Sequence, residues 1–446
     1  MHSTLSAGFA LAMSLPLAAA AAPVSEIDAL RQEIAAIRDA YEARLQALEQ
    51  RLKAAESSPA VAAPRAAVAA SAGSASSDNP SASRSSSGAN SFNPAMSLIL
   101  SGLYASTSRD PSRYAIKGFA LPEGAEVGPG TRGFSLAETE LGLSASIDPW
   151  LRGSASIALH GDDSVSVEEA YVQTTALGSG FGLKAGRFFS GIGYLNAQHA
   201  HSWDFVDNPL AYQALLGTQY GDDGVQLTWL APTDQYLELM AEIGRGRGFP
   251  GSDGARNGAG MRALALHTGG DIGTSHNWRA GVSVLQAEAA NLGLVDTDAA
   301  GASTTRLFSG RSRVWIADAV WKWAPQGNAS RTSFKLQGEY LRSTRKGGLL
   351  DDAGQDSDGA AQQSGWYVQG IYQFMPRWRA GLRTERLDAG NGLRPSKNTL
   401  MLDFNASEFS RVRLQLAQDR ANFGAADRQV FLQYQMSLGA HGAHGY

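Results

Sequence analysis

The chain has 446 residues, of which 50 are glycine, 9 tryptophan and 13 tyrosine, and it contains no cysteine. The lack of cysteine excludes a disulfide scaffold and a thiolate metal site, and a net charge of −4 gives no basic surface for nucleic acid. After the first 25 residues no run of 18 apolar residues occurs, which excludes a transmembrane helix. Abundant glycine, tyrosine and tryptophan favour many alternating strands over a helical globule.

Residues 1–22 have the pattern of a signal peptide. A short apolar core, LAMSLPLAAAAA, runs from Leu11 to Ala22 and ends in small residues that suit cleavage near Ala20. An uncleaved anchor is the alternative, but about a dozen apolar residues is too short to span a bilayer. The chain is therefore predicted to be exported.

Residues 23–56 have the period of a helix. Their apolar residues recur at spacings of three and four, with one extra step of four that would locally unwind a left-handed supercoil. A helix packed on its own protein is the alternative, but the next segment offers no packing partner. We therefore predict a periplasmic coiled coil, and isoleucine at both kinds of seam position favours a trimer. The seam residues are Ile27, Leu30, Ile34, Ile37, Tyr41, Leu45, Leu48 and Leu52.

Residues 57–91 are rich in alanine, serine and proline and almost lack large apolar side chains. Such a segment cannot bury enough surface to fold, so we predict a disordered linker. As a flexible chain it would span on the order of 30–35 Å and tether the coiled coil to the main domain, residues 92–446.

From residue 92 onward, apolar and polar side chains alternate with the period of two that is typical of strands. In Arg377–Glu385, for example, Trp378, Ala380 and Leu382 alternate with arginine and glutamate. A half-exposed soluble sheet would show the same alternation. Aromatic residues at the ends of the apolar faces, and connections that alternate between short and long, favour lipid outside and water inside instead. The predicted fold is an all-β, transmembrane, antiparallel β-barrel.

About sixteen candidate strands can be counted, and an even number places both ends of the barrel on the periplasmic side, with the short turns. The interior of such a barrel is wide enough to leave an aqueous channel. The last strand ends on the aromatic Tyr446, in phase with the apolar row. This terminus is similar to the signal that the barrel-assembly machinery recognises. The predicted location is the outer membrane of a Gram-negative bacterium, in contact with lipid and lipopolysaccharide.

Two consecutive blocks, Val167–Gln173 (VEEAYVQ) and Gly182–Phe188 (GLKAGRF), resemble a strand pair of phosphate-selective-porin-like outer-membrane proteins. A group of proteobacterial outer-membrane proteins labelled zinc-regulated or TonB-dependent receptors is similar in more blocks. These are FNPAMSLIL, GFSLAETEL, GLKAGRFFSGIGYLN, HAHSWDF, GDDGVQLTWLAPT and SLGAHGAHGY. The resemblance covers roughly residues 92–446 and implies an exported pore, trimeric or monomeric, without giving its solute.

The connection from Ser190 to Gly217 carries the most unusual residues of the barrel domain. It is too long for a tight turn, too apolar for a solvated tip, and joins the fifth and sixth predicted strands. We expect it to fold into the lumen and constrict the pore, anchored to the wall by Trp203, Phe205 and Leu215. The predicted constriction residues are His199, His201, Trp203, Asp204 and Asp207.

His199, His201 and Asp204 could together bind a divalent metal. Imidazoles two residues apart on an extended segment point the same way, and imidazole with carboxylate suits zinc. The alternative is that these side chains only hydrogen-bond the loop to the barrel wall. No resident cofactor is expected, although zinc could be bound or transported.

Charged residues are predicted to line the pore on two opposed walls, one acidic and one basic. Such walls would create a transverse electric field at the constriction. Alternatively, the charges pair across strands and only stabilise the wall. The predicted pore-lining residues are Glu138, Glu140, Glu238, Glu242, Lys335, Arg379, Arg383, Glu385, Arg411 and Arg413.

Together these features predict a homotrimeric porin for passive diffusion of small hydrophilic solutes or ions through a loop-constricted pore. A dedicated divalent-metal (zinc) uptake channel is the alternative. No catalytic arrangement stands out by spacing, so an enzyme is not predicted. A barrel enzyme built on His160 or His199 with a nearby serine is a weaker alternative, as is a trimeric adhesin, because one chain here encodes a whole barrel.

Overall fold

The structure is a computed structural model that describes residues 94–137, 139–254, 257–351 and 354–439. The predicted signal peptide, coiled coil and linker lie outside these residues, as does the C-terminal Tyr446. Within the described ranges, no helix is long and apolar enough to cross a lipid bilayer.

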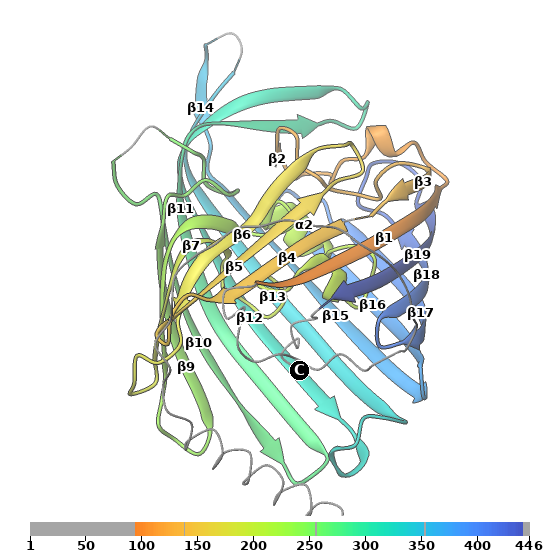
Figure 1. Cartoon of the computed structure of the whole chain (residues 1–446). Coiled ribbons are helices and arrows are strands. Elements are labelled where there is room, and N and C mark those ends of the chain that lie inside the picture. The colour runs from red at the N-terminus through yellow and green to blue at the C-terminus, as the bar shows by residue number, and fades with distance from the viewer. Residues whose placement is uncertain (1–93, 138, 255–256, 352–353, 440–446) are drawn as a thin grey trace, which may run out of the picture. The chain divides into compact units, whose positions relative to one another are not determined.

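The described residues form one antiparallel sheet that closes on itself (Figure 1). Of its nineteen strands, β2 (Leu121–Pro122) and β14 (Asp356–Asp358) are short and belong to loops. Both β3 (Gly133–Leu136) and β4 (Thr139–Ser146) pair with β1 and form two halves of one wall strand. Nineteen minus two, with β3 and β4 counted once, leaves sixteen wall strands, which confirms the predicted barrel.

The other wall strands follow the chain order around the barrel, and β1 closes it by pairing with β19. Their bounds are β1 (Ala95–Thr107), β5 (Leu151–Leu159), β6 (Val165–Thr174), β7 (Phe181–Phe189), β8 (Gly221–Leu230), β9 (Tyr236–Gly244), β10 (Met261–Ile272), β11 (His276–Thr297), β12 (Ser303–Trp323), β13 (Ser333–Leu350), β15 (Ala361–Met375), β16 (Trp378–Asp388), β17 (Ser396–Ser407), β18 (Ser410–Asp419) and β19 (Asp427–Gly439). The few helical turns are η1 (Pro111–Arg113), η2 (Ala200–Ser202), α2 (Leu210–Leu216) and η3 (Pro325–Gly327).

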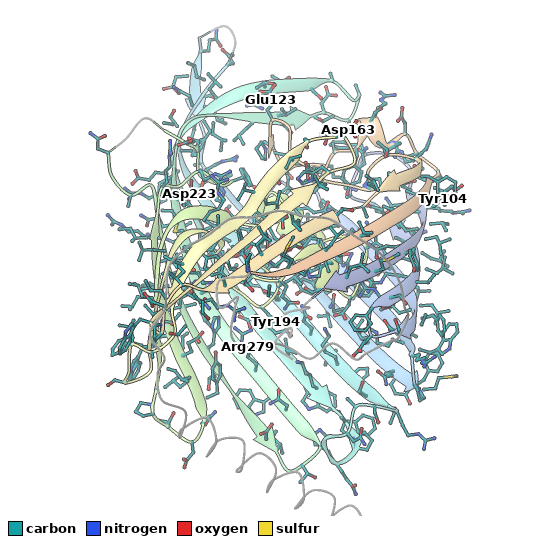
Figure 2. All side chains as sticks on the ribbon, in the orientation of Figure 1. Tyr104, Glu123, Asp163, Tyr194, Asp223 and Arg279 are labelled. Atoms are coloured by element: carbon teal, nitrogen blue, oxygen red, sulfur yellow. The ribbon has the colours of Figure 1, made fainter. Side chains whose placement is uncertain are left out.

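The two faces of the wall have opposite chemistry. On β16, Leu382 is 54% exposed on the outside, whereas its neighbour Arg383 is 1% exposed on the inside. On β17, Leu400 and Lys397 show the same contrast, at 56% and 1%. Soluble proteins bury their apolar residues and expose their charged ones, so this reversed distribution fits an outer face in lipid. Tyr104, at the edge of the barrel in Figure 2, belongs to the exposed aromatic residues of the outer face.

Part of the lumen is filled by apolar side chains. The loop between β1 and β3 contributes Ile116 and Phe119, and the loop between β7 and β8 contributes Ile192, Leu195 and every residue of α2 except Gln213. They pack against wall residues that face inward, and α2 is visible within the ring of strands in Figure 1. The inward-facing wall residues of this cluster include Met240, Leu285, Val314, Ile316, Leu341 and Leu387. The space that the barrel width alone would leave for water is therefore reduced.

Candidate functional site: a loop held across the lumen

The connection between β7 and β8, residues 190–220, turns into the barrel directly after β7; we call it the constriction loop. Glu242 on β9 accepts hydrogen bonds from the Ser190 hydroxyl (2.5 Å) and from the Gly191 amide (2.9 Å). Ser190 and Glu242 are both almost completely buried. A buried carboxylate with two donors is well satisfied, so Glu242 fixes the direction in which the chain leaves the strand.

A second wall carboxylate, Glu339 on β13, holds the next stretch of the loop. It accepts hydrogen bonds from the backbone amides of Tyr194 and Leu195, each at 3.0 Å. It also accepts a hydrogen bond of 2.8 Å from the Tyr212 hydroxyl on α2. Gly193 adopts a left-handed φ of 65°, and a Cβ at this position would overlap the Glu339 carboxylate and the Tyr212 hydroxyl. The close approach of loop and wall therefore requires glycine.

Helix α2 is the best-buried part of the loop, since every one of its residues is buried. Its first backbone amide, Leu210 N, donates a 2.5 Å hydrogen bond to Glu385 on β16. Gly217 ends the helix in the left-handed conformation. The helix is thus capped by the wall at one end and by glycine at the other.

Asp204 of the loop reaches the basic side of the wall. It forms an ion pair with Lys335 on β13, lies 3.6 Å from the Arg379 guanidinium, and accepts a 3.1 Å hydrogen bond from Gln369. Burial alone would raise the pKa of Asp204, but Lys335 and Arg379 outweigh it and lower the pKa to about 2. Asp204 is therefore an anion whose charge is balanced by the wall.

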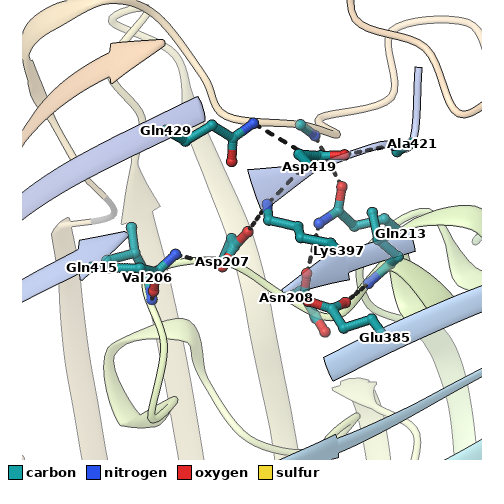
Figure 3. Close-up of polar contacts among 12 residues, drawn as sticks. Val206, Asp207, Asn208, Gln213, Glu385, Lys397, Gln415, Asp419, Ala421 and Gln429 are labelled. Atoms are coloured by element: carbon teal, nitrogen blue, oxygen red, sulfur yellow. Dashed lines mark hydrogen bonds and ion pairs between the residues drawn. The ribbon is translucent and has the colours of Figure 1, made fainter. Parts of the chain in front are cut away.

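Asp207 is held still more tightly on the same side (Figure 3). Its carboxylate accepts hydrogen bonds from Arg383 (2.7 Å), Lys397 (2.5 Å) and Gln415 (2.9 Å). Against the effect of burial, Lys397 and Arg383 keep the pKa of Asp207 below its usual range. The Arg383 guanidinium also stacks on the Phe205 ring, with 4.5 Å between the guanidinium carbon and the ring centroid.

The two histidines of the loop lie on the opposite, acidic side of the lumen. His201 Nδ1 is 2.8 Å and His199 Nδ1 is 3.3 Å from the same Glu140 oxygen. His199 Nδ1 is also 3.2 Å from Glu168, and its Nε2 is 3.0 Å from Glu169. Burial would lower the pKa of His199, but hydrogen bonds to the three glutamates raise it well above the ordinary value.

A β-bulge explains why two consecutive glutamates of β6 both reach the lumen. Ser156 pairs with Glu169 and Ile157 pairs with Val167, which leaves Glu168 as an extra residue without a partner on β5. In a regular strand, neighbouring side chains point to opposite faces. The bulge breaks that alternation and turns both carboxylates towards His199.

Beneath the loop lies a cavity of about 1230 Å³, which we call the vestibule. Its lower rim consists of residues in the short turns, such as Gly273, Ala324 and Glu408. Its upper wall includes His199 and Asp204 of the constriction loop. In Figure 2, Tyr194 of the loop and Arg279 of β11 lie close together in the lumen, and both line the vestibule. The vestibule therefore extends from the short-turn side up to the loop.

A protein of Aquifex aeolicus (strain VF5), described as an uncharacterized protein, is 32% identical to this chain over 342 residues. The match covers 71% of this chain and 70% of the relative. The two proteins belong to one family. No protein-family model matches the chain.

Among solved structures, the anion-selective porin from Comamonas acidovorans is similar, with a TM-score of 0.50 and 12% sequence identity. The similarity covers 78% of this chain and 99% of the porin. The outer membrane channel DcaP of Acinetobacter baumannii has a TM-score of 0.46 and 11% identity, over 77% of this chain and 97% of DcaP. The Comamonas structure shows that this chain has the porin fold.

Most of the predicted pore-lining residues lie inside the barrel of this chain. Arg413 pairs across strands with Asp403 at 2.7 Å, and Arg379 contacts the same carboxylate at 2.6 Å, as cross-strand pairing would require. Glu238 lies beside His267 at 3.3 Å, and Glu138 is outside the described residues. Seven of the predicted pore-lining residues contact the constriction loop: Glu140, Glu242, Lys335, Arg379, Arg383, Glu385 and Arg411.

The predicted metal ligands do not all come together. His199 and His201 stack with ring centroids 5.6 Å apart, but the carboxylate that touches both is Glu140 rather than Asp204, which pairs with Lys335. His201 lies in the 3₁₀ turn η2, so the imidazoles share a side without the extended backbone that the sequence suggests. Of the three predicted anchors, Phe205 packs with Ile371 and Met401, whereas Trp203 and Leu215 join the larger apolar cluster.

Several important residues were missed at the sequence level. Lys397 and Asp403 lie on the inward row of β17, so the period of two could have identified both; it does place Glu339 on the polar row of β13, but no role in the site was predicted for it. Glu168 and Glu169 could not be found in this way, because a bulge carries no such signal. The weaker enzyme hypothesis required a serine near His160. Ser166 at the start of β6 has its Oγ 2.7 Å from the imidazole of His160, which lies in the connection between β5 and β6.

Proposed function

We propose that the protein is an outer-membrane channel in which the constriction loop controls passive diffusion of small hydrophilic solutes and ions. The observation that carries this proposal is a loop fixed to opposite walls of a porin-type barrel, directly above an open vestibule. The loop forms charge-assisted hydrogen bonds to the wall carboxylates Glu140, Glu242 and Glu339. Its own carboxylate, Asp207, accepts such bonds from Lys397 and Arg383. Catalysis is no part of the proposal.

Control by the loop follows from what surrounds it. The vestibule gives solutes access from the short-turn side, while the loop and the apolar cluster around α2 occupy the lumen next to it. The conducting path must therefore pass along the loop or depend on its movement. Polar contacts at both ends of the loop set how easily it moves.

Planar-bilayer recording of the purified full-length chain tests this proposal. We expect ohmic conductance from the wild type and a several-fold higher conductance when residues 194–217 are replaced by a short glycine-serine connection. The wall strands are untouched, and a sixteen-stranded barrel without its loop should leave an open aqueous channel. If neither protein conducts, the protein is not a channel. If the wild type and the loop replacement have equal conductance, the loop does not control diffusion.

Uptake of a divalent metal such as zinc is the second candidate function. The observation that favours it is the pair of imidazoles, His199 and His201, on the vestibule wall. Reversal potentials under a zinc gradient would measure zinc permeation. A metal-uptake channel should lose zinc permeation in the double variant His199→Ala/His201→Ala while its potassium conductance persists. Equal zinc permeation in both proteins would contradict this function.

A homotrimer, joined through the barrel and the coiled coil, is part of the same proposal. It rests on the seam pattern of residues 23–56. Chemical crosslinking in outer-membrane vesicles, with and without these residues, tests it. Trimers are expected from the full chain and fewer from the truncated one, whereas monomers in both would contradict the proposal.

A further inference from the structure

The part of the constriction loop that carries His199 and His201, which we call its acidic end, is surrounded by a surplus of negative charge. Glu140, Glu168 and Glu169 surround only two imidazoles, those of His199 and His201. Even with both imidazoles protonated, these five side chains would carry a net charge of −1; the neighbouring Arg411 donates a hydrogen bond to the His201 carbonyl. Among the described residues, none of the three glutamates pairs with lysine or arginine. The side chains of Glu140 and His201 are each only 7% exposed, so water cannot screen this charge well.

We propose that Glu140, Glu168, His199 and His201 form a binding site for one divalent transition-metal ion, such as zinc, that clamps the loop to the wall. The site would join β4 and β6 to the loop. Because imidazoles that ligate a metal are neutral, the ion's charge of +2 would take the place of the two imidazolium protons and offset two of the three carboxylates. Metal binding does not depend on the proposed channel function. Only the expected effect on conductance rests on it.

The spacing of the donor atoms suits such an ion. Donor atoms about 2.0–2.2 Å from a tetrahedral zinc ion are about 3.3–3.6 Å from one another. His199 Nδ1 lies 3.3 Å from Glu140 and 3.2 Å from Glu168, and His201 Nδ1 lies 2.8 Å from Glu140. One donor atom from each of Glu140, His199 and His201 lies within 4.8 Å of the others. Small side-chain shifts would complete the four-ligand set.

Glu169 has the position of an outer carboxylate that orients a metal-binding histidine. It contacts His199 Nε2, while Nδ1 of the same ring faces Glu140 and Glu168. Its other oxygen accepts a 3.0 Å hydrogen bond from the Phe189 amide, which fixes the carboxylate in place. Carboxylate–histidine–metal triads of this kind select the tautomer whose free nitrogen binds the ion.

An ion can reach the site from the vestibule. His199 and His201 line this cavity, and the three glutamates lie behind the imidazoles on the wall. Imidazole and carboxylate donors without a thiolate suit zinc or a neighbouring first-row ion better than copper(I). The ion would thus enter past the imidazoles and settle against the carboxylates.

Zinc titration of the chelator-treated full-length protein, followed by metal analysis after dialysis, tests the site. We expect one tightly bound zinc per chain in the wild type and none in Glu140→Gln. The matched control is Asp204→Asn, which changes a loop carboxylate on the basic side and should keep the zinc. Cobalt(II) should give the intense visible bands of a tetrahedral site in the wild type and Asp204→Asn alone.

Folding of each variant is checked by the far-ultraviolet circular dichroism of the barrel, and His201→Asn repeats the test if Glu140→Gln does not fold. Equal zinc binding by wild type and by folded ligand variants would overturn the site. In bilayers, zinc should lower the conductance of the wild type and leave that of Glu140→Gln unchanged. If zinc binds without lowering the conductance, the bound ion does not clamp the loop to the wall. If no protein conducts at all, the channel proposal fails while the binding result stands.

Discussion

Two parts of the constriction loop meet opposite kinds of wall residue. At its basic end, as we call it, Asp204 and Asp207 lie among lysine and arginine side chains, and at its acidic end His199 and His201 lie among glutamates. Both ends are buried and both join loop to wall. On the basic side every loop carboxylate has at least two cationic partners. On the acidic side three carboxylates share two imidazoles.

The difference separates a permanent anchor from a conditional one. The basic end is held by protein side chains alone, because each loop carboxylate has lysine and arginine partners on the wall. At the acidic end, two of the three carboxylate charges are offset only when protons or a metal ion are taken up from the solution. The composition of the solution should therefore change the acidic end, whereas the basic end should respond to mutation and to strong acid only.

Removing the Asp207 carboxylate from the basic end should have the largest effect. The variant Asp207→Ala leaves Lys397 and Arg383, each 1% exposed, without the loop carboxylate that they share. Breaking a buried pair typically costs about 3–5 kcal/mol, so we expect a clear loss of thermal stability and a larger conductance. Thermal unfolding and bilayer recording measure the two effects.

A matched control is Asp223→Ala, which removes another ion pair of the barrel, with Arg187, at 2.7 Å. Both partners are about one-third exposed, at 36% and 32%, so the change should cost no more than about 1 kcal/mol. If Asp207→Ala behaves like this control in both measurements, the basic end does not anchor the loop.

Acid should release the basic end over a defined pH range. The pKa of Asp204 is lowered in the fold to about 2, so its contribution is present above the unfolded value near 4 and is lost as the pH falls towards 2. The contribution of Asp204 to the free energy of unfolding is about 2–3 kcal/mol. Conductance recorded between pH 6 and pH 2 should rise in this range for the wild type. In Asp204→Asn the rise attributable to this group should be absent, and an identical acid profile in both proteins would contradict the assignment.

The architecture could be predicted from the sequence because strand alternation and loop lengths are local patterns. The period of two placed Arg383 and Glu385 inside and Leu382 outside, and the structure has them so. The inward path of the constriction loop followed from its length and apolar residues. The apolar filling around α2 did not, since it depends on which inward-facing wall residues meet the loop in space.

The candidate site was only half visible in the sequence. His199 and His201 are two residues apart and stand out, whereas their carboxylate partners come from strands about thirty and sixty residues earlier in the chain. The nearest carboxylate in sequence, Asp204, points to the other wall. Glu168 and Glu169 meet His199 only because of a bulge, and a bulge is fixed by the pairing of strands and not by residue type.

The smallest expected effect concerns the carboxylate that orients His199. In Glu169→Gln the four proposed zinc ligands remain, but one of the two acceptor oxygens that hold the ring and the Phe189 amide is replaced by an amide. Loss of such an outer partner typically weakens metal binding 10–100-fold, so we expect a zinc dissociation constant higher by about that factor, with one zinc still bound at saturation. Competition with a chromophoric chelator measures it. An unchanged zinc affinity would mean that Glu169 only holds the loop to the wall. The acidic end would then resemble the basic end in that its side chains serve as anchors of the loop.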